Sequence, residues 1–203
     1  AKNLNVHGGK ITITDAYTGI STGSAFTIYN GIINSSGSDN GIIAYNLMNV
    51  YDGEITASSS GNGSAISLKE LNSNGNCKLT IEGGKVTATN TGNLYGIDAV
   101  GGLTITGGTV TAQGGKNTVG EGQVGIFTYG YNITISGGDV TAIGGDAKAG
   151  SNQDGGAGID GNLTVNGGTV IASGGAGDGD GSNGSGISGT IELGSGIKLY
   201  AGA

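Results

Sequence analysis

The sequence predicts an all-β fold: a right-handed parallel β-helix, or solenoid, with about eight coils of three short strands each, formed as a single domain by residues 1–203. Three observations support this prediction. A ten-residue phrase recurs along the chain, short segments within it alternate between apolar and polar residues, and 47 of the 203 residues are glycine while none is proline. A helical domain is excluded, because each interior glycine costs a helix about 1 kcal/mol relative to alanine.

The composition excludes several other classes of protein. Collagen needs glycine at every third position and abundant proline, and a disulfide scaffold needs more than one cysteine. No apolar run approaches the roughly 18–20 residues of a membrane-spanning helix. The formal net charge is −7 and all eight basic residues are lysine, which argues against binding to nucleic-acid phosphates. We therefore expect neither a nucleic-acid partner nor insertion into a membrane.

The first two strands of each coil come from the recurring phrase Leu-Thr-Ile-x-Gly-Gly-x-Val-Thr-Ala. Its clearest copies are Leu79–Ala88, Leu103–Ala112, Ile133–Ala142 and Leu163–Ala172. Weaker copies begin at Leu4, Phe26 and Met48, and a truncated one begins at Ile191. In one copy Leu103 and Ile105 point to one side and Thr104 to the other, which is the period-two pattern of a half-buried strand. The Gly-Gly pair between the two segments tolerates the positive φ of a tight turn.

The third strand of each coil is centred on an isoleucine that follows a small residue. These isoleucines are Ile20, Ile42, Ile66, Ile97, Ile126, Ile159 and Ile187. Equivalent residues of successive coils should stack at about 4.8 Å and form a continuous apolar core. We predict a right-handed coil, because parallel crossover connections are overwhelmingly right-handed.

Loop length varies in two places. The loop after the second strand is long in three coils, at Gly114–Val124, Gly144–Gly158 and Gly174–Gly186. Such loops on one side of a solenoid are either its binding side or unselected decoration. A different insertion, Leu68–Lys78, follows Ile66, and its Leu68–Leu71 segment could form one helical turn. Cys77 within it is expected to be a buried small residue rather than a nucleophile.

Three rings are predicted to form an exposed column. His7, Tyr29 and Tyr51 occupy the same position in the first three coils, so they should stack at the coil spacing. The column has two interpretations. Exposed rings can contact the apolar faces of sugars, or the column can simply stabilise the surface as neighbouring side chains do in any sheet.

A second candidate binding surface follows the third-strand isoleucines. Asp98, Phe127 and Asp160 occupy successive coils, and Tyr129 lies on the same face. The two carboxylates should be about 9–10 Å apart, two strand spacings. An inverting glycosidase uses paired carboxylates at a comparable separation. The alternative is that they are solvated or accept hydrogen bonds from a glycan.

The acidic residues of the long loops raise the question of calcium. Asp178 and Asp180 alternate with glycines, and Asp146 and Asp154 lie in the preceding coil's loop. Ca²⁺ takes six to eight oxygen ligands, which carboxylates and backbone carbonyls at glycines can supply. Solvated turns are the competing interpretation. No cofactor is required by the sequence, and Ca²⁺ is the one that these residues could hold.

The repeated GGxVTA phrase and the small-Gly-Ile segments resemble a known type of domain. They stand here at Gly107–Ala112, Gly137–Ala142 and Gly156–Ile159. They are similar to the Gly-rich right-handed β-helix domains of secreted and surface proteins from bacteria, the carbohydrate-binding domain-containing proteins, whose architecture is pectate-lyase-like. The resemblance implies a location at the cell surface and binding of acidic or cellulosic polysaccharide, sometimes with Ca²⁺. The lyases of this superfamily use an Arg or Lys base, and this chain has no arginine.

We therefore expect an extracellular module, secreted or on the cell surface, that binds a polysaccharide or a cell-surface glycan, or mediates adhesion, without catalysis. Fold-level analogy supplies much of this expectation. One alternative is a lyase or hydrolase that acts on acidic glycans with Asp98 and Asp160. The other is a passive stalk within a larger surface protein.

Overall fold

The computed structural model describes residues 2–70 and 77–202, and in these residues it contains strands but no helix. Seventeen strands form one large sheet, in which every pairing between named strands is parallel. One isolated antiparallel bridge joins Lys116 and Gly122. The described part of the chain therefore includes no helix that could cross a membrane.

The strands follow the chain in this order: β1 (Leu4–Val6), β2 (Lys10–Thr22), β3 (Ala25–Ile28), β4 (Ile32–Tyr45), β5 (Leu47–Val50), β6 (Glu54–Ser59), β7 (Ile66–Lys69), β8 (Lys78–Ile81), β9 (Lys85–Asn90), β10 (Ile97–Ala99), β11 (Leu103–Ile105), β12 (Thr109–Gln113), β13 (Ile126–Ile143), β14 (Ile159–Ser173), β15 (Ile187–Ser188), β16 (Ile191–Leu193) and β17 (Lys198–Gly202).

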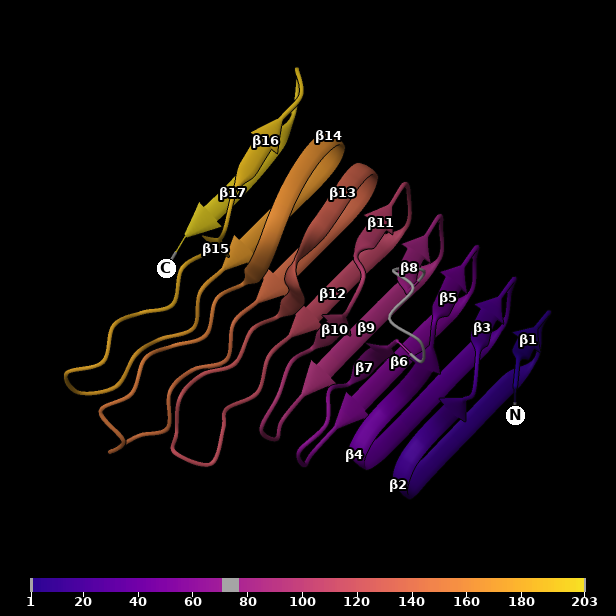
Figure 1. Cartoon of the computed structure of the whole chain (residues 1–203), viewed down its shortest axis with the longest axis horizontal. Helices are drawn as coiled ribbons and strands as arrows, with labels where there is room; N and C mark the ends of the chain where they lie inside the picture. The colour runs from indigo at the N-terminus through magenta and orange to yellow at the C-terminus, as the bar shows by residue number, and fades with distance from the viewer. Residues whose placement is uncertain (1, 71–76, 203) are drawn as a thin grey trace.

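Equivalent segments of successive repeats pair with one another in register. The first residue of the phrase forms one row across the sheet: Leu4, Phe26, Met48, Leu79, Leu103, Ile133, Leu163 and Ile191. The predicted third-segment isoleucines form another row, from Ile20 to Ile187. Successive repeats thus lie side by side along the long axis, with the two termini at opposite ends (Figure 1). The repeat alignment from the sequence is confirmed, including its weaker copies.

The apolar side of each row forms a single hydrophobic cluster. Side chains from the first seven repeats form it, from Val6 in β1 to Ala172 in β14, and Leu199 of β17 packs against its end. Ile191 and Leu193 of the last repeat lie outside the cluster, 48% and 51% exposed, because only one side of that repeat has a neighbour. One repeat alone cannot bury its apolar face, so the core depends on adjacent repeats.

The strand pattern differs from the predicted three short strands per repeat. Strands β2, β4, β13 and β14 are long and each covers more than one predicted segment. β13 runs through the Gly137–Gly138 turn, because its ladder of pairs with β14 continues on both sides of the bend. The predicted helical turn at Leu68–Leu71 is wrong for Leu68 and Lys69, which extend β7 by pairing with β4; Leu71 lies outside the described residues.

The three long loops are as the sequence predicted. They join β12 to β13, β13 to β14 and β14 to β15, and all three project from the same side of the sheet (Figure 1). The starts of β13, β14 and β15 lie at the base of these loops.

Candidate functional site

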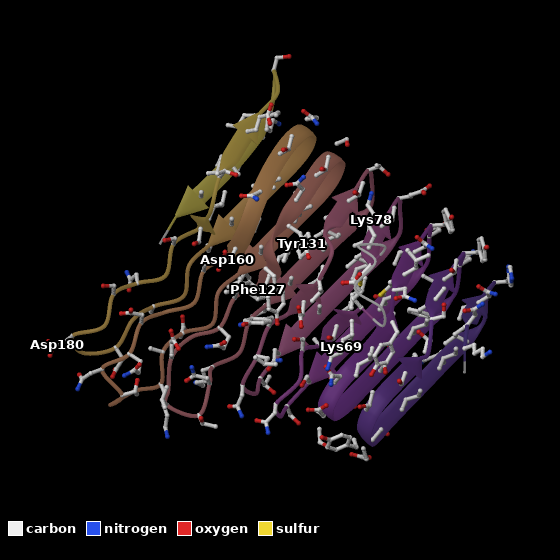
Figure 2. The ribbon with its side chains drawn as sticks, in the orientation of Figure 1. Lys69, Lys78, Phe127, Tyr131, Asp160 and Asp180 are labelled. Atoms are coloured by element: carbon white, nitrogen blue, oxygen red, sulfur yellow. The ribbon has the colours of Figure 1, made fainter. Side chains whose placement is uncertain are left out.

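Asp98, Phe127 and Asp160 lie in one row at the start of β10, β13 and β14. Asp98 pairs with Phe127, and Phe127 pairs with Asp160. Figure 2 shows Phe127 and Asp160 close together where the long loops meet the strands. The predicted pairing of this row is therefore confirmed, with the aromatic ring between the two carboxylates. The expectation that both carboxylates are solvated is wrong for Asp98, which is 7% exposed.

Phe127 is the centre of a cluster of three aromatic rings. The Tyr95 and Tyr129 ring centroids each lie 4.4 Å from that of Phe127, at interplanar angles of 41° and 52°. Tilted rings at this distance attract one another through their quadrupoles in addition to the area that they bury. Tyr129 remains 57% exposed, so the cluster reaches the solvent.

Local backbone structure places the two tyrosines beside Phe127. Tyr129 and Gly130 both have positive φ, 54° and 78°, in a tight turn that the Thr128 hydroxyl closes by donating to the Tyr131 carbonyl at 2.8 Å. Positive φ is costly for tyrosine, so this turn needs the hydrogen bond and ring packing that hold it. On the other side, the buried Asn90 amide donates to the Tyr95 carbonyl at 3.2 Å.

A groove with a volume of about 520 Å³ runs along this cluster. Its walls are the loops before β13, β14 and β15 and the first residues of those strands. Its lining comprises Tyr95, Glu121, Gly122, Gln123, Val124, Phe127, Asp154, Gly155, Gly156, Ala157, Asp160, Ser182, Asn183, Gly184, Ser185 and Ser188. The volume lies within the range of small-molecule sites. Aromatic rings, carboxylates and backbone groups thus line one concave surface.

The Asp98 carboxyl is beside this groove but is not among its lining residues. The residue is 7% exposed, its Oδ1 has no hydrogen-bond partner, and its Oδ2 accepts a long bond of 3.5 Å from the Ser67 hydroxyl. Burial raises the pKa of Asp98 to about 6, although Lys69 and Ser67 act to lower it. The carboxyl is therefore held in a site that disfavours its charge.

The pKa values of the other titratable groups in the cluster are also raised. Burial raises the pKa of Asp160, which is only partly buried. Burial, and then the nearby Tyr129, raises the pKa of Tyr95 to about 12. Burial and Asp98 raise the pKa of Tyr129. Both tyrosines therefore keep their hydroxyl protons at neutral pH and can donate hydrogen bonds to a ligand.

The predicted column of His7, Tyr29 and Tyr51 is present. The His7 and Tyr29 rings lie 4.5 Å apart and within 5° of parallel, and the Tyr29 and Tyr51 rings lie 5.2 Å apart and within 9°. Both faces of Tyr29 are therefore covered by neighbouring rings. A sugar has no access to those faces, so the column offers ring edges and hydroxyl groups for contact. This geometry fits a surface-stabilising role better than a sugar platform.

The four loop aspartates do not come together in one cluster. No group of three or more His, Cys, Asp and Glu side chains suited to a metal ion occurs in residues 2–70 and 77–202. Asp180 lies at the outer end of its loop, far from Asp160 (Figure 2). The Ca²⁺ interpretation thus stays a prediction without a ligand cluster to support it.

Three of these aspartates bind backbone amides of the neighbouring loop. Asp146 accepts a hydrogen bond from the Ala176 amide at 2.8 Å, and Asp154 accepts one from the Ser182 amide at 2.7 Å. Asp178 accepts two, from the Ser151 and Asn152 amides. These bonds fasten one loop to the next, which gives the aspartates a structural role.

The sequence pattern did not single out Tyr95 or Glu121. Tyr95 stands two residues before Ile97, and the same position in the next repeat is Val124, which also lines the groove. A comparison of that position across the repeats would have placed Tyr95 beside Val124, at the edge of the groove. Cys77, by contrast, is where the sequence predicted, 1% exposed, and burial raises its pKa to about 11.

Comparisons with known proteins identify no relative: no family model, curated protein or solved structure matches the chain.

Proposed function

We propose that the chain is a right-handed parallel β-helix that binds polysaccharide without catalysis, as a secreted or cell-surface module that can serve in adhesion. The in-register rows and the single core support the coiled architecture, and the strong bias of parallel crossovers supports its hand. The observation that carries the binding function is the groove beside Phe127, where aromatic rings and carboxylates line one concave surface.

The chemistry of this groove suits a sugar chain. Aromatic rings pack against the C–H faces of sugars, while carboxylates and tyrosine hydroxyls exchange hydrogen bonds with sugar hydroxyls. Phe127 supplies an apolar ring, and Asp160 beside it supplies an acceptor. The groove is lined by residues of four successive repeats, from Tyr95 to Ser188, so an extended ligand can contact several repeats at once.

Affinity electrophoresis and calorimetry with a panel of soluble polysaccharides test this proposal. We expect Phe127→Ala to weaken binding about tenfold or more, because it removes the ring that Tyr95 and Tyr129 pack against. Tyr200→Ala is the matched control, since Tyr200 is 59% exposed and lies on β17 outside the groove. Loss of binding in Tyr29→Ala but not in Phe127→Ala would move the site to the ring column. Absence of binding to every glycan would favour a passive stalk.

A second candidate is a hydrolase or lyase that uses Asp98 and Asp160. The observation in its favour is that burial raises the pKa of both carboxyls, to about 6 at Asp98. Against it, Asp98 is buried and does not line the groove, so a bound sugar would not touch it. Assays for new reducing ends and for unsaturated products on pectins and neutral glycans separate the two candidates, and product formation that Asp98→Asn abolishes would establish catalysis.

A further inference from the structure

The charged side chains of the groove are all acidic. Glu121, Asp154 and Asp160 line it, and no lysine does so among the described residues. The ion pair between Lys85 and Glu54, on β9 and β6, lies outside the groove. No ion pair to these three carboxylates is found among the described residues. Glu121 accepts a hydrogen bond from the Asn117 side-chain amide at 2.7 Å, and Asp154 accepts one from the Ser182 backbone amide at 2.7 Å.

Two of these carboxylates occupy equivalent positions in successive repeats. Glu121 and Asp154 occupy the same place in successive loops, five residues before the isoleucine of the row, and the Gly122 amide donates to the Asp154 carbonyl at 2.8 Å. Asp160 lies in the neighbouring row next to Phe127. A chain that lies along the groove therefore passes Glu121 and then Asp154 about one strand spacing, 4.8 Å, further on, with Asp160 of the same repeat as Asp154 in the neighbouring row.

Two further features reinforce this negative surface. The faces of aromatic rings attract cations, and Phe127 and Tyr95 both line the groove. Asp98 in β10 pairs with Phe127 on the side opposite to Asp160. It is 7% exposed, and its Oδ1 has no hydrogen-bond partner. When Asp98 is ionised, it adds a fourth negative charge next to the ring.

We propose that the groove selects glycans that carry protonated amino groups, such as chains of 2-amino-2-deoxy sugars, over uncharged and acidic glycans. This inference rests on the proposed function and names the ligand class of the same groove. Ammonium groups would pair with Glu121, Asp154 and Asp160 and lie against the aromatic faces. Uronic acids would meet carboxylates of like charge, so the acidic polysaccharide that the sequence resemblance implies is disfavoured here.

Three hexasaccharides of one backbone length provide the test by calorimetry at about pH 6, where such amines are protonated. They are the β-1,4-linked glucosamine hexamer, its fully N-acetylated counterpart and a galacturonate hexamer. Each exposed charge pair contributes up to about fivefold in affinity, so three pairs should favour the glucosamine hexamer by about tenfold or more. High salt should remove most of this preference, because the screening length falls to about 3 Å at 1 M.

Variants show whether the preference comes from the groove. Glu121→Gln and Asp160→Asn should each lower the ratio of glucosamine to N-acetylglucosamine affinity about threefold. Asp139→Asn is the control, because it removes an exposed carboxylate on β13 that does not line the groove. An equal fall of the ratio in all three variants would show non-specific attraction to the acidic chain and overturn the inference.

The outcomes separate the inference from the function beneath it. Equal or tighter binding of the acetylated or galacturonate hexamer overturns the ammonium preference and leaves polysaccharide binding in place. If the glucosamine hexamer fails to bind while a neutral glycan binds, the ammonium preference is likewise overturned and polysaccharide binding is retained. Failure of all three hexamers and of the wider glycan panel overturns both.

Discussion

The Asp98 carboxyl is held in the fold at an energetic cost. It is 7% exposed, and its Oδ1 has no partner. Burial raises its pKa from 3.8 to about 6, more than the Lys69 charge and the Ser67 hydroxyl lower it. A pKa difference between the folded and unfolded chain makes stability depend on pH.

Whether stability rises or falls with pH depends on which state of the chain, folded or unfolded, holds the Asp98 proton. Between about pH 4 and pH 6 the folded chain keeps the Asp98 proton, while the unfolded chain has lost it. The contribution of Asp98 to stability is therefore fully present below pH 4 and is lost as the pH rises to 6. The rise of the Asp98 pKa from 3.8 to about 6 corresponds to about 3 kcal/mol.

We expect Asp98→Asn to be more stable than the parent chain by about 1–3 kcal/mol at pH 7, since it removes the buried charge and keeps the shape. Below about pH 4 the two chains should be equally stable. Melting temperatures at a series of pH values measure this difference. A difference that does not change with pH, or that favours the parent chain at pH 7, would contradict the assigned burial of the charge.

At the scale of elements, the Gly-Gly turns set how closely repeats approach. Gly108 has a φ of 79°, and a Cβ added there would lie 2.6 Å from the Gly84 carbonyl oxygen. Gly9 holds the same place in the first repeat with a φ of 81°, and an added Cβ would meet nothing within 4 Å. The two glycines thus share a backbone conformation, but only Gly108 has the backbone of a preceding repeat against it.

We expect Gly108→Ala to lower the melting temperature much more than Gly9→Ala. The positive φ lowers the stability of each variant by about 1–2 kcal/mol. Only in Gly108→Ala must the backbones of two neighbouring repeats also move apart to make room for the Cβ. Gly130→Ala controls for the position of Gly9 at the end of the molecule, because Gly130 has a φ of 78°, lies within β13 and has open space around its Cβ position. Equal losses in all three variants would mean that the close approach carries no cost.

The elements also show what the sequence could predict. The register rows were predictable, because residues such as Leu103 and Val110 recur with the same neighbours in each repeat. The merging of segments into β13 was not, because it depends on hydrogen bonds to another repeat rather than on local pattern. The extension of β7 through Lys69 has the same cause: pairing with β4 overrode the helical preference of a short apolar and charged run.

The candidate site was predictable only in part, for a related reason. Asp98, Phe127 and Asp160 follow an isoleucine row, so the pattern placed them together. Tyr95 joins them through a ring contact across repeats, and Glu121 joins through a loop whose shape the pattern does not specify. The stacking of Tyr29 was predictable, but the covering of its faces depends on ring orientation, which no residue spacing shows.

At the scale of the whole molecule, the chain behaves as a row of nearly equivalent repeats. Each repeat pairs with the one before and the one after, and the core passes continuously through them. Stability in such an array is close to a sum of repeat and interface contributions. The groove, by contrast, belongs to four particular repeats. Folding and binding should therefore respond differently to the loss of a repeat.

Two deletions of one whole repeat test this separation. Removing residues 26–47 joins Ala25 to Met48 and lets Leu4 pair with Met48 in the register that Phe26 now occupies. We expect this chain to fold with a lower melting temperature and to keep its glycan affinity, because the groove is intact. Removing residues 103–132 should also leave a folded sheet, since Leu79 can pair with Ile133 as Leu103 does now.

The second deletion takes away Phe127 and the Glu121 loop, so glycan affinity should fall at least tenfold while the strand signal in circular dichroism is retained. Unfolding of the chain that lacks 26–47 would show that the repeats are not interchangeable and that stability is not a sum over them. Full glycan affinity in the folded chain that lacks 103–132 would instead place the binding surface outside the groove. Because the first deletion removes the Tyr29 ring and the second leaves it, the pair of chains also assigns binding to the groove or to the ring column.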